Sequence, residues 1–293
     1  FDWSDAYLYN FYSVCPLQSG DVWIVGNSGL IAHYDPEQDT WFVQESGTSE
    51  NLYQVTFANK SQGWIVSTDG RILRTEDGGK MWKEQETPVE QHLFSISCVD
   101  ASTAWAVGCF GTILHTRDGG QTWKRQHEKI DRIYNKVHFV DRQHGWVVGE
   151  YGVILHTDDG GRSWEEQKHP MGEVTFFSLD FLNRQKGWVT GMGGRMLMTS
   201  DGGENWKPVD TPVKSHLFDI DVLADRQYSV GFKGVLLMAQ SKEWLDETEK
   251  IPTRSWLKNI VFVDEKRGWT VGSVGVVLRT ENGGQSWIQV PQK

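Results

Sequence analysis

The fold of this chain is decided by a stretch of 20 residues, GWVVGEYGVILHTDDGGRSW, which runs from Gly145 to Trp164. Its two tryptophans belong to two ladders that recur along the chain at intervals of 38 to 43 residues. The first ladder consists of Trp23, Trp64, Trp105, Trp146, Trp188, Tyr228 and Trp269. The second consists of Trp41, Trp82, Trp123, Trp164, Trp206, Trp244 and Trp287. One unit is therefore repeated seven times, with a period typical of a four-stranded propeller blade.

The alternation of apolar and polar residues predicts four short strands in each unit. In the second unit these strands cover residues 52–58, 64–66, 71–75 and 81–85. Such a unit cannot bury both of its faces alone and has to stack on its neighbours. We therefore predict an all-β fold, a seven-bladed β-propeller of four-stranded antiparallel blades that forms a single domain over residues 1–293. The expected blades cover roughly residues 6–46, 47–87, 88–128, 129–170, 171–211, 212–251 and 252–293.

The ring can close in two ways. Residues 1–5 add an edge strand to the last blade, or the seventh unit closes with its own residues 286–290. The sixth unit departs most from the repeat, because it has Tyr228 in the first ladder and residues 238–241 where the other units have an Asp-containing turn.

Two recurring turn motifs indicate structure and not chemistry. A Gly-x-x-Gly hairpin occurs in six units, and we expect glycine there because a tight hairpin demands positive φ. No helix follows it, so a phosphate-binding loop is not indicated. A Thr-x-Asp-Gly-Gly-x-x-Trp turn occurs in four units, and in a fifth with Asn282 for Asp. Its carboxylate can accept backbone N–H bonds within the turn. Because each copy belongs to a different blade, the copies cannot converge on one ligand.

Composition narrows the classes of partner. The formal net charge of −10 and the pI near 5.4 argue against nucleic acid as the main partner, because that role needs a basic surface. Three cysteines and nine histidines form no ligand set, so we expect neither a metal site nor a cofactor. No stretch approaches the roughly 18 apolar residues that span a bilayer. The chain begins at Phe1 and not Met, from which we expect a removed signal or anchor segment or a trimmed end.

The repeated Thr-x-Asp-Gly-Gly-x-x-Trp turns are similar to the Asp-box repeats of sialidase-like propellers. The fuller unit, seen at residues 145–164 and 187–206, resembles the photosystem II stability and assembly factor family and its relatives in non-photosynthetic bacteria. This resemblance implies a non-enzymatic protein of the lumen, periplasm or another extracytoplasmic space. We also expect the protein to be monomeric when free and to associate with membranes through a removed N-terminal segment. It implies a membrane protein or membrane complex as partner. The matched motifs are scaffold motifs and carry no binding residue across.

The alternative is a carbohydrate-active propeller, either a sialidase-like or other glycoside hydrolase or a lectin. A sialidase needs an arginine triad for the substrate carboxylate, yet the Arg-Ile-Pro sequence typical of that family is absent and residues 1–17 contain no arginine. Other glycosidases need two facing carboxylates, for which the expected first strands offer Asp180, Asp219 and Asp221. Other units have Ser, Gln, Thr or Cys in these slots, so we interpret the slots as small or polar positions of a crowded axis.

We expect a partner on the face that carries the Gly-x-x-Gly hairpins and the loops entering each first strand. Hairpin tips normally favour polar residues, so aromatic tips indicate recognition. Trp256 lies outside both ladders and has basic neighbours, which is the composition of an interface hot spot. The predicted partner-binding residues are Trp256, Arg254, Lys258, Arg132, Lys136, Lys233, Phe110, Tyr151, Phe232 and Tyr53. Scattered solvated charges are the competing interpretation of the basic members.

Two further positions bear on this prediction. The second residue of the first strand is aromatic in five units, as Tyr12, Tyr53, Phe94, Phe177 and Phe218. These rings are either a recognition surface or packing between blades, and we favour packing. On the opposite face, basic residues recur in the turns at residues 141–145, 183–187 and 264–268. They are paired with acids in sequence and are expected to be solvated, and they form the rival surface for an acidic or lipid-headgroup partner.

Overall fold

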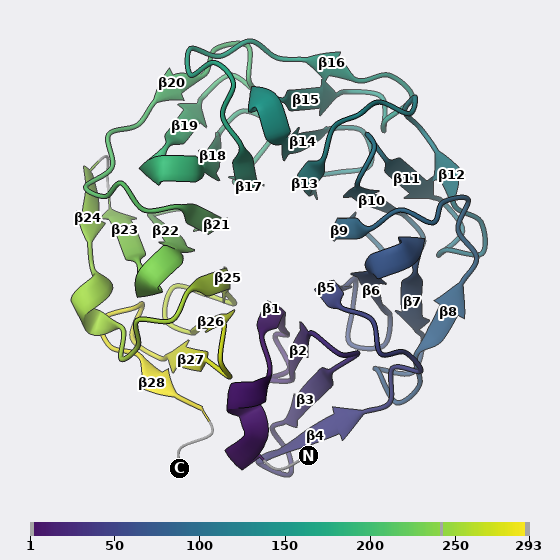
Figure 1. Ribbon diagram of the computed structural model, residues 1–293, viewed down its shortest axis with the longest axis vertical. Coiled ribbons are helices and arrows are strands. Elements are labelled where there is room, and N and C mark those ends of the chain that lie inside the picture. The colour runs from purple at the N-terminus through teal and green to yellow at the C-terminus, as the bar shows by residue number, and fades with distance from the viewer. Residues whose placement is uncertain (1–2, 241–242, 291–293) are drawn as a thin grey trace.

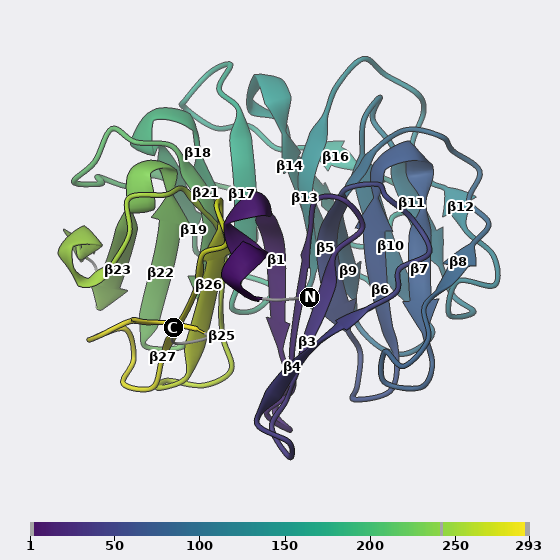
Figure 2. The same cartoon turned by 60° about the horizontal axis from the view of Figure 1, so that its bottom comes forward.

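The computed structural model describes residues 3–240 and 243–290, which form seven four-stranded antiparallel sheets arranged as blades around a central axis (Figure 1). This architecture confirms the predicted seven-bladed β-propeller. Within every blade the strands follow one another in chain order from the axis outward. Seen from the side, short 3-10 turns lie on one face of the ring, whereas the β3–β4 hairpin extends furthest from the other face (Figure 2).

The strands have the following bounds. The innermost strands are β1 (Phe11–Pro16), β5 (Leu52–Phe57), β9 (Leu93–Cys98), β13 (Tyr134–Phe139), β17 (Phe176–Phe181), β21 (Leu217–Val222) and β25 (Leu257–Phe262). The second strands are β2 (Val22–Gly26), β6 (Gly63–Ser67), β10 (Ala104–Gly108), β14 (Gly145–Gly149), β18 (Gly187–Gly191), β22 (Arg226–Gly231) and β26 (Gly268–Gly272). The third strands are β3 (Ile31–Asp35), β7 (Ile72–Thr75), β11 (Ile113–Thr116), β15 (Ile154–Thr157), β19 (Met196–Thr199), β23 (Leu236–Gln240) and β27 (Val277–Thr280). The outer strands are β4 (Thr40–Gln44), β8 (Lys83–Gln85), β12 (Lys124–Arg125), β16 (Glu165–Glu166), β20 (Lys207–Pro208), β24 (Glu243–Asp246) and β28 (Ile288–Gln289).

Six 3-10 turns complete the described elements: η1 (Trp3–Leu8), η2 (Thr68–Gly70), η3 (Glu150–Gly152), η4 (Met192–Gly194), η5 (Phe232–Gly234) and η6 (Thr248–Lys250). The seventh sheet contains four consecutive strands ending in β28, and β1 packs beside β25 to close the ring. Of the two forms of closure, the described residues thus show the one in which the seventh unit supplies its own outer strand. The alternative edge strand at residues 1–5 lies partly outside the described residues, and its described part belongs to η1.

The first tryptophan ladder is the core between blades. Trp105 is fully buried and stacks on Phe139 of the next blade at a centroid distance of 3.5 Å, while its Nε1 donates to the Gly160 carbonyl at 3.2 Å. In the sixth blade, Tyr228 keeps both contacts, because its ring stacks on Phe262 at 3.9 Å and its hydroxyl donates to the Gly283 carbonyl at 3.1 Å. The tyrosine therefore preserves the ladder where tryptophan is missing. Each such ring removes about 150 to 250 Å² from water, which is worth roughly 4 to 6 kcal/mol gross.

The Asp-containing turn is a clamp, as the sequence predicts. In the second blade, the Thr75 hydroxyl donates to Asp77 at 2.9 Å and accepts the Gly79 N–H at 2.7 Å. Asp77 also accepts the Met81 N–H at 3.0 Å, and this bond is the main reason why the pKa of Asp77 lies below its usual range. The tryptophan that ends the motif joins neighbouring blades, since Trp82 Nε1 donates to a glutamine of the blade before it at 3.1 Å.

The two glycines of the Gly-x-x-Gly hairpin are required for different reasons. The second glycine has positive φ in every blade, for example +75° at Gly152, and the residue before it does too. Two consecutive positive φ values define the type I′ hairpin. The first glycine is extended, so our expectation of positive φ there is wrong. A Cβ at Gly149 would collide with the carbonyl oxygen of Ile133, which immediately precedes β13. The first glycine therefore allows the innermost strand to approach closely.

Candidate binding site at the mouth of the axial channel

A β-bulge in every innermost strand directs one side chain toward the mouth of the channel. In the first blade, Phe11 pairs with Gly26 and Ser13 pairs with Val25, so Tyr12 is the extra residue between them. The same register shift occurs in all seven blades, at Tyr12, Tyr53, Phe94, Asn135, Phe177, Phe218 and Lys258. Bulges re-aim side chains near functional sites. These residues occupy the recurrent second position of the predicted first strand, and the bulge explains why that position faces the mouth.

Six aromatic rings form a continuous arc around this mouth. Neighbouring centroids lie 5.0 Å apart from Phe94 to Tyr53 and 5.4 Å apart from Tyr53 to Tyr12. Trp256, just before β25, continues the arc at 6.4 Å from both Tyr12 and Phe218, and Phe177 follows Phe218 at 5.4 Å. All six are half-buried. Trp256 takes the aromatic place in the seventh blade, where the bulge residue is a lysine.

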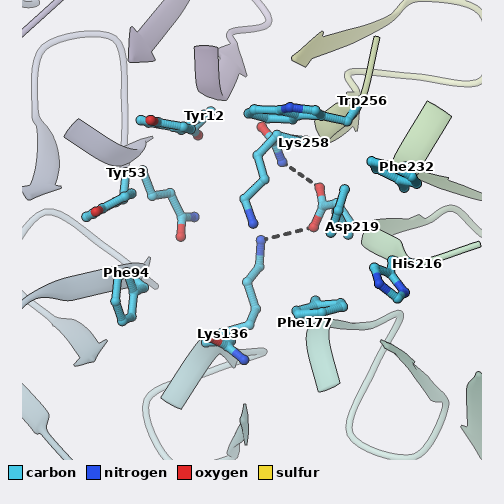
Figure 3. A pocket seen from close by; sticks show the side chains of 15 residues that line it. Tyr12, Tyr53, Phe94, Lys136, Phe177, His216, Asp219, Phe232, Trp256 and Lys258 are labelled. Carbon is cyan, nitrogen blue, oxygen red and sulfur yellow. Dashed lines mark hydrogen bonds and ion pairs between the residues drawn. The ribbon is translucent and has the colours of Figure 1, made fainter. Parts of the chain in front are cut away.

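The arc encloses a cavity of about 600 Å³ that also contains charged groups (Figure 3). Its lining residues are Tyr12, Ser13, Tyr53, Gln54, Phe94, Asn135, Lys136, Phe177, His216, Phe218, Asp219, Phe232, Trp256, Lys258 and Asn259. The side chains of Lys136 and Lys258 extend from opposite sides and their amines point toward one another at its centre (Figure 3). Lys136 lies 3.4 Å from Asp219, and the Lys258 amine lies 5.4 Å from the Phe218 centroid. The cavity thus combines an apolar rim with a cationic centre.

Asp219 is held by groups from three blades. One oxygen accepts the Ser178 hydroxyl at 2.6 Å and the Lys136 amine at 3.4 Å. The other accepts the Asn259 side-chain amide at 2.5 Å and the Ile260 N–H at 3.0 Å. Each oxygen therefore has two donors, and Asp219 is only 3% exposed.

Asp180 and Asp221 also join innermost strands to one another. Asp180 accepts the Val222 N–H at 2.7 Å and Asp221 accepts the Phe262 N–H at 3.0 Å. Burial raises the pKa of both carboxyls, and for Asp221 the neighbouring Asp180 adds to this effect. Other blades make the same kind of bond with Ser, Gln or Asn: the Ser95 hydroxyl, for example, accepts the Val137 N–H at 3.1 Å. Adjacent innermost strands belong to different sheets and share no ladder hydrogen bonds. These side chains therefore accept the backbone N–H groups that face the neighbouring blade.

A family comparison agrees with the repeat and with this architecture. The family model described as photosynthesis system II assembly factor YCF48 matches residues 35–129 and 126–218, which is more than half of the chain. The chain belongs to the YCF48 family. A search of curated proteins found no significant match.

Solved structures similar to this YCF48-family chain share its fold. YCF48 from Cyanidioschyzon merolae aligns with a TM-score of 0.79 at 18% identity, covering 93% of this chain and 96% of that one. YCF48 bound to D1 peptide aligns with a TM-score of 0.66 at 20% identity, covering 81% and 80%. Virginiamycin B lyase from Staphylococcus aureus aligns with a TM-score of 0.80 at 14% identity, covering 90% and 92%. Because an enzyme is among these structures, the likeness at such low identity identifies the propeller and not its activity.

In this YCF48-family propeller, half of the residues predicted to bind a partner line the mouth cavity: Trp256, Lys258, Lys136, Phe232 and Tyr53. The aromatic second positions make the ring-to-ring contacts that we favoured as their role, and the same rings also line the cavity, as the alternative of a recognition surface requires. Ser13, Gln54 and Asn259 were not among the predicted binding residues, nor was His216, which accepts the Gly193 N–H at 3.0 Å. Asn259 lies 40 residues after Asp219 and 123 residues, or three repeats, after Lys136, and this spacing could have identified it as a neighbour at the axis.

The other predicted residues do not line the cavity. Arg254 pairs with Glu249 at 3.2 Å and Arg132 pairs with Glu166 at 2.9 Å, so both guanidiniums have carboxylate partners. The remaining three, Phe110, Tyr151 and Lys233, are exposed at hairpin tips with φ of 54°, 57° and 63°. The prediction thus combined two groups, one inside the mouth and one on its outer rim.

The rival surface on the opposite face consists largely of paired charges. Arg142 lies 2.8 Å from Asp100, and Arg184 lies 2.7 Å from Asp141, each pair joining adjacent blades. Arg267 lies 2.7 Å from Asp264 of the same turn. This pairing agrees with the expected solvated role.

The described residues contain no group of three or more His, Cys, Asp or Glu arranged to hold a metal ion. Among the helices of residues 3–240 and 243–290, none is long and apolar enough to cross a membrane.

Proposed function

We propose that this chain is a non-catalytic assembly or accessory factor that binds a segment of an integral membrane protein in the mouth cavity. The observation that carries the proposal is the arc of six aromatic rings around a concave site with a cationic centre. Half-buried aromatic side chains in a concave site are typical anchors for a partner. Membership of the YCF48 family supports a role in assembling a membrane complex. One solved YCF48 structure contains a D1 peptide, which supports a peptide as the bound form of the client.

We place this activity outside the cytoplasm, at the surface of the membrane that holds the client. The support is the resemblance to lumenal and periplasmic factors. Fractionation of source cells into cytoplasmic and lumenal or periplasmic contents tests this location. Recovery of the protein with a cytoplasmic marker and apart from a lumenal or periplasmic marker would contradict it.

The non-catalytic part of the proposal is supported by the hydrogen bonding of the three axial carboxylates. Asp180, Asp219 and Asp221 each accept a backbone N–H of the neighbouring blade, a role that serine or glutamine fills elsewhere in the ring. A panel of glycosides tests the carbohydrate-active alternative. Turnover that Asp219→Asn or Asp221→Asn abolishes in a protein that remains folded would overturn the scaffold function.

The central experiment is a pull-down from detergent-solubilised membranes of the source organism. Wild-type protein is compared with Trp256→Ala, which removes the middle of the aromatic arc, and with Phe42→Ala on β4, a matched aromatic control at the outer edge. We expect an integral membrane protein in the wild-type and Phe42→Ala samples and its loss with Trp256→Ala. Equal recovery with Trp256→Ala would show that the mouth is not the binding site.

A further inference from the structure

The mouth cavity carries a positive charge that its own residues leave unbalanced. Two lysines and one aspartate line it, which leaves one positive charge in a chain whose formal net charge is −10. Asp180 and Asp221 line the adjoining cavity along the channel, which Lys136 also lines, and burial raises the pKa of both carboxyls, which favours their neutral form. The aspartate cannot accept more, because both oxygens of Asp219 already have two donors. An additional anion is therefore the group that the cavity lacks.

Lys258 shows most clearly that the cavity lacks an anion. In the described part of the chain its amine lies over the Phe218 ring at 5.4 Å and has no hydrogen-bond acceptor or carboxylate within bonding distance. Burial lowers the pKa of Lys258, and the nearby Lys136 amine acts in the same direction while Asp219 opposes it. The amine thus has no protein acceptor in the described residues, and an anion between the two amines would supply one.

We propose that Lys136 and Lys258 form an anion subsite that holds a carboxylate of the bound peptide, either an acidic side chain or the terminal carboxylate. This inference rests on the proposed peptide-binding function and adds the chemical class of the ligand. A carboxylate placed between the amines accepts from both and neutralises the cavity. The residue next to it then lies against the aromatic arc, so the preferred ligand combines an acidic group with an apolar or aromatic neighbour.

The geometry favours this ligand over a neutral peptide. Lys258 and Lys136 extend from β25 and β13, on opposite sides of the channel, and converge at one point (Figure 3). A neutral segment would bury both amines further and supply no charge in return. A hydrogen bond between a carboxylate and a charged amine typically strengthens binding about tenfold to a hundredfold.

The test uses a synthetic library of random peptides about a dozen residues long with free carboxyl termini, panned on immobilised full-length protein. Enriched peptides are then measured by fluorescence anisotropy in three forms: unchanged, with the terminus amidated, and with Asp and Glu replaced by Asn and Gln. The proteins compared are wild type, Lys258→Met and the matched control Lys168→Met, an exposed lysine outside the cavity. Lys258→Met is the main variant because it removes no ion pair, whereas Lys136→Met would leave Asp219 without its amine.

We expect acidic groups beside apolar residues to be enriched on wild type and on Lys168→Met but not on Lys258→Met. Neutralising the relevant carboxylate should weaken binding to wild type about tenfold or more and should weaken binding to Lys258→Met by a clearly smaller factor, because only Lys136 remains there. Loss on amidation identifies a terminal carboxylate, and loss on Asp or Glu replacement identifies a side chain. Peptides that bind wild type equally well in neutral form would overturn the anion subsite while leaving peptide binding intact. Enrichment of no peptide over a bare surface would overturn the proposed function as well.

Discussion

Replacement of Asp219 with alanine distinguishes a structural carboxylate from a catalytic one. The substitution removes four hydrogen-bond acceptances at once, from Ser178, Lys136, Asn259 and the Ile260 backbone. A catalytic role predicts a folded and inactive protein. The structural role derived from the contacts predicts a destabilised one, because Asp219 joins three innermost strands that have no ladder bonds with each other.

The magnitude follows from the groups that lose a partner. A buried donor left unsatisfied costs about 1 to 3 kcal/mol, and breaking a buried ion pair by removing one partner costs about 3 to 5 kcal/mol. The hydroxyl and amide of the neighbours can turn to other acceptors, whereas the Ile260 N–H is fixed in the backbone and the Lys136 amine loses the carboxylate that lies 3.4 Å from it. We therefore expect Asp219→Ala to lower the free energy of unfolding by about 3 to 5 kcal/mol. Asp219→Asn keeps the shape and one oxygen, so its cost should be about 1 to 2 kcal/mol.

Urea and thermal unfolding followed by tryptophan fluorescence measure both values. For a domain of this size, about 1 kcal/mol corresponds to roughly 2 °C in Tm, so Asp219→Ala should lower Tm by about 6 to 10 °C. The control is Asp131→Ala, an exposed aspartate outside the channel, for which a change below about 0.5 kcal/mol is expected. An unfolding midpoint of Asp219→Ala equal to that of Asp131→Ala would refute the reasoning.

Three further predictions concern the stability of the propeller. Tyr228→Phe should lower the free energy of unfolding by about 1 to 2 kcal/mol, because the hydrogen bond from the hydroxyl to the next blade is lost. Tyr228→Trp should be more stable than Tyr228→Phe, because the indole N–H can replace the hydroxyl as donor. The urea midpoints of the two variants test this. Gly149→Ala should lower the free energy of unfolding by about 1 to 3 kcal/mol, because the new Cβ collides with the Ile133 carbonyl. Gly193→Ala, with positive φ but open space around it, should lower it by about 1 to 2 kcal/mol and leave peptide binding intact. If both variants lost peptide binding equally, Gly149 would not differ from Gly193 in holding the innermost strand. Burial raises the pKa of Asp221 in the folded protein above its unfolded value of about 3.9, so the fold loses stability as pH rises above that value. Asp221→Asn should therefore raise the free energy of unfolding at pH 7. Unfolding curves measured over a series of pH values should show that this gain vanishes below a pH of about 4.

The sequence by itself determined the repeat and most of the scaffold. Strand positions in the second unit agree with β5 to β8 within one or two residues, because apolar alternation and turn residues act locally. The Asp-containing turn was also predictable, since its hydrogen bonds join residues two to four positions apart. Spacing even placed Asp180, Asp219 and Asp221 at the axis. Features that depend on interactions between residues close in sequence, and that recur in the repeats, can therefore be predicted from the sequence.

Only the tertiary structure decided which side chains meet at the mouth. Lys136 and Lys258 are 122 positions apart, and nothing local indicates that their amines converge or that Arg254 and Arg132 pair with glutamates instead. The bulge that directs Tyr12 and its counterparts toward the channel is a register shift between two strands, which the alternation of a single strand does not encode. The scaffold is set by interactions within one repeat, whereas the candidate site is set by closure of the ring, which brings one residue from each blade to a common axis.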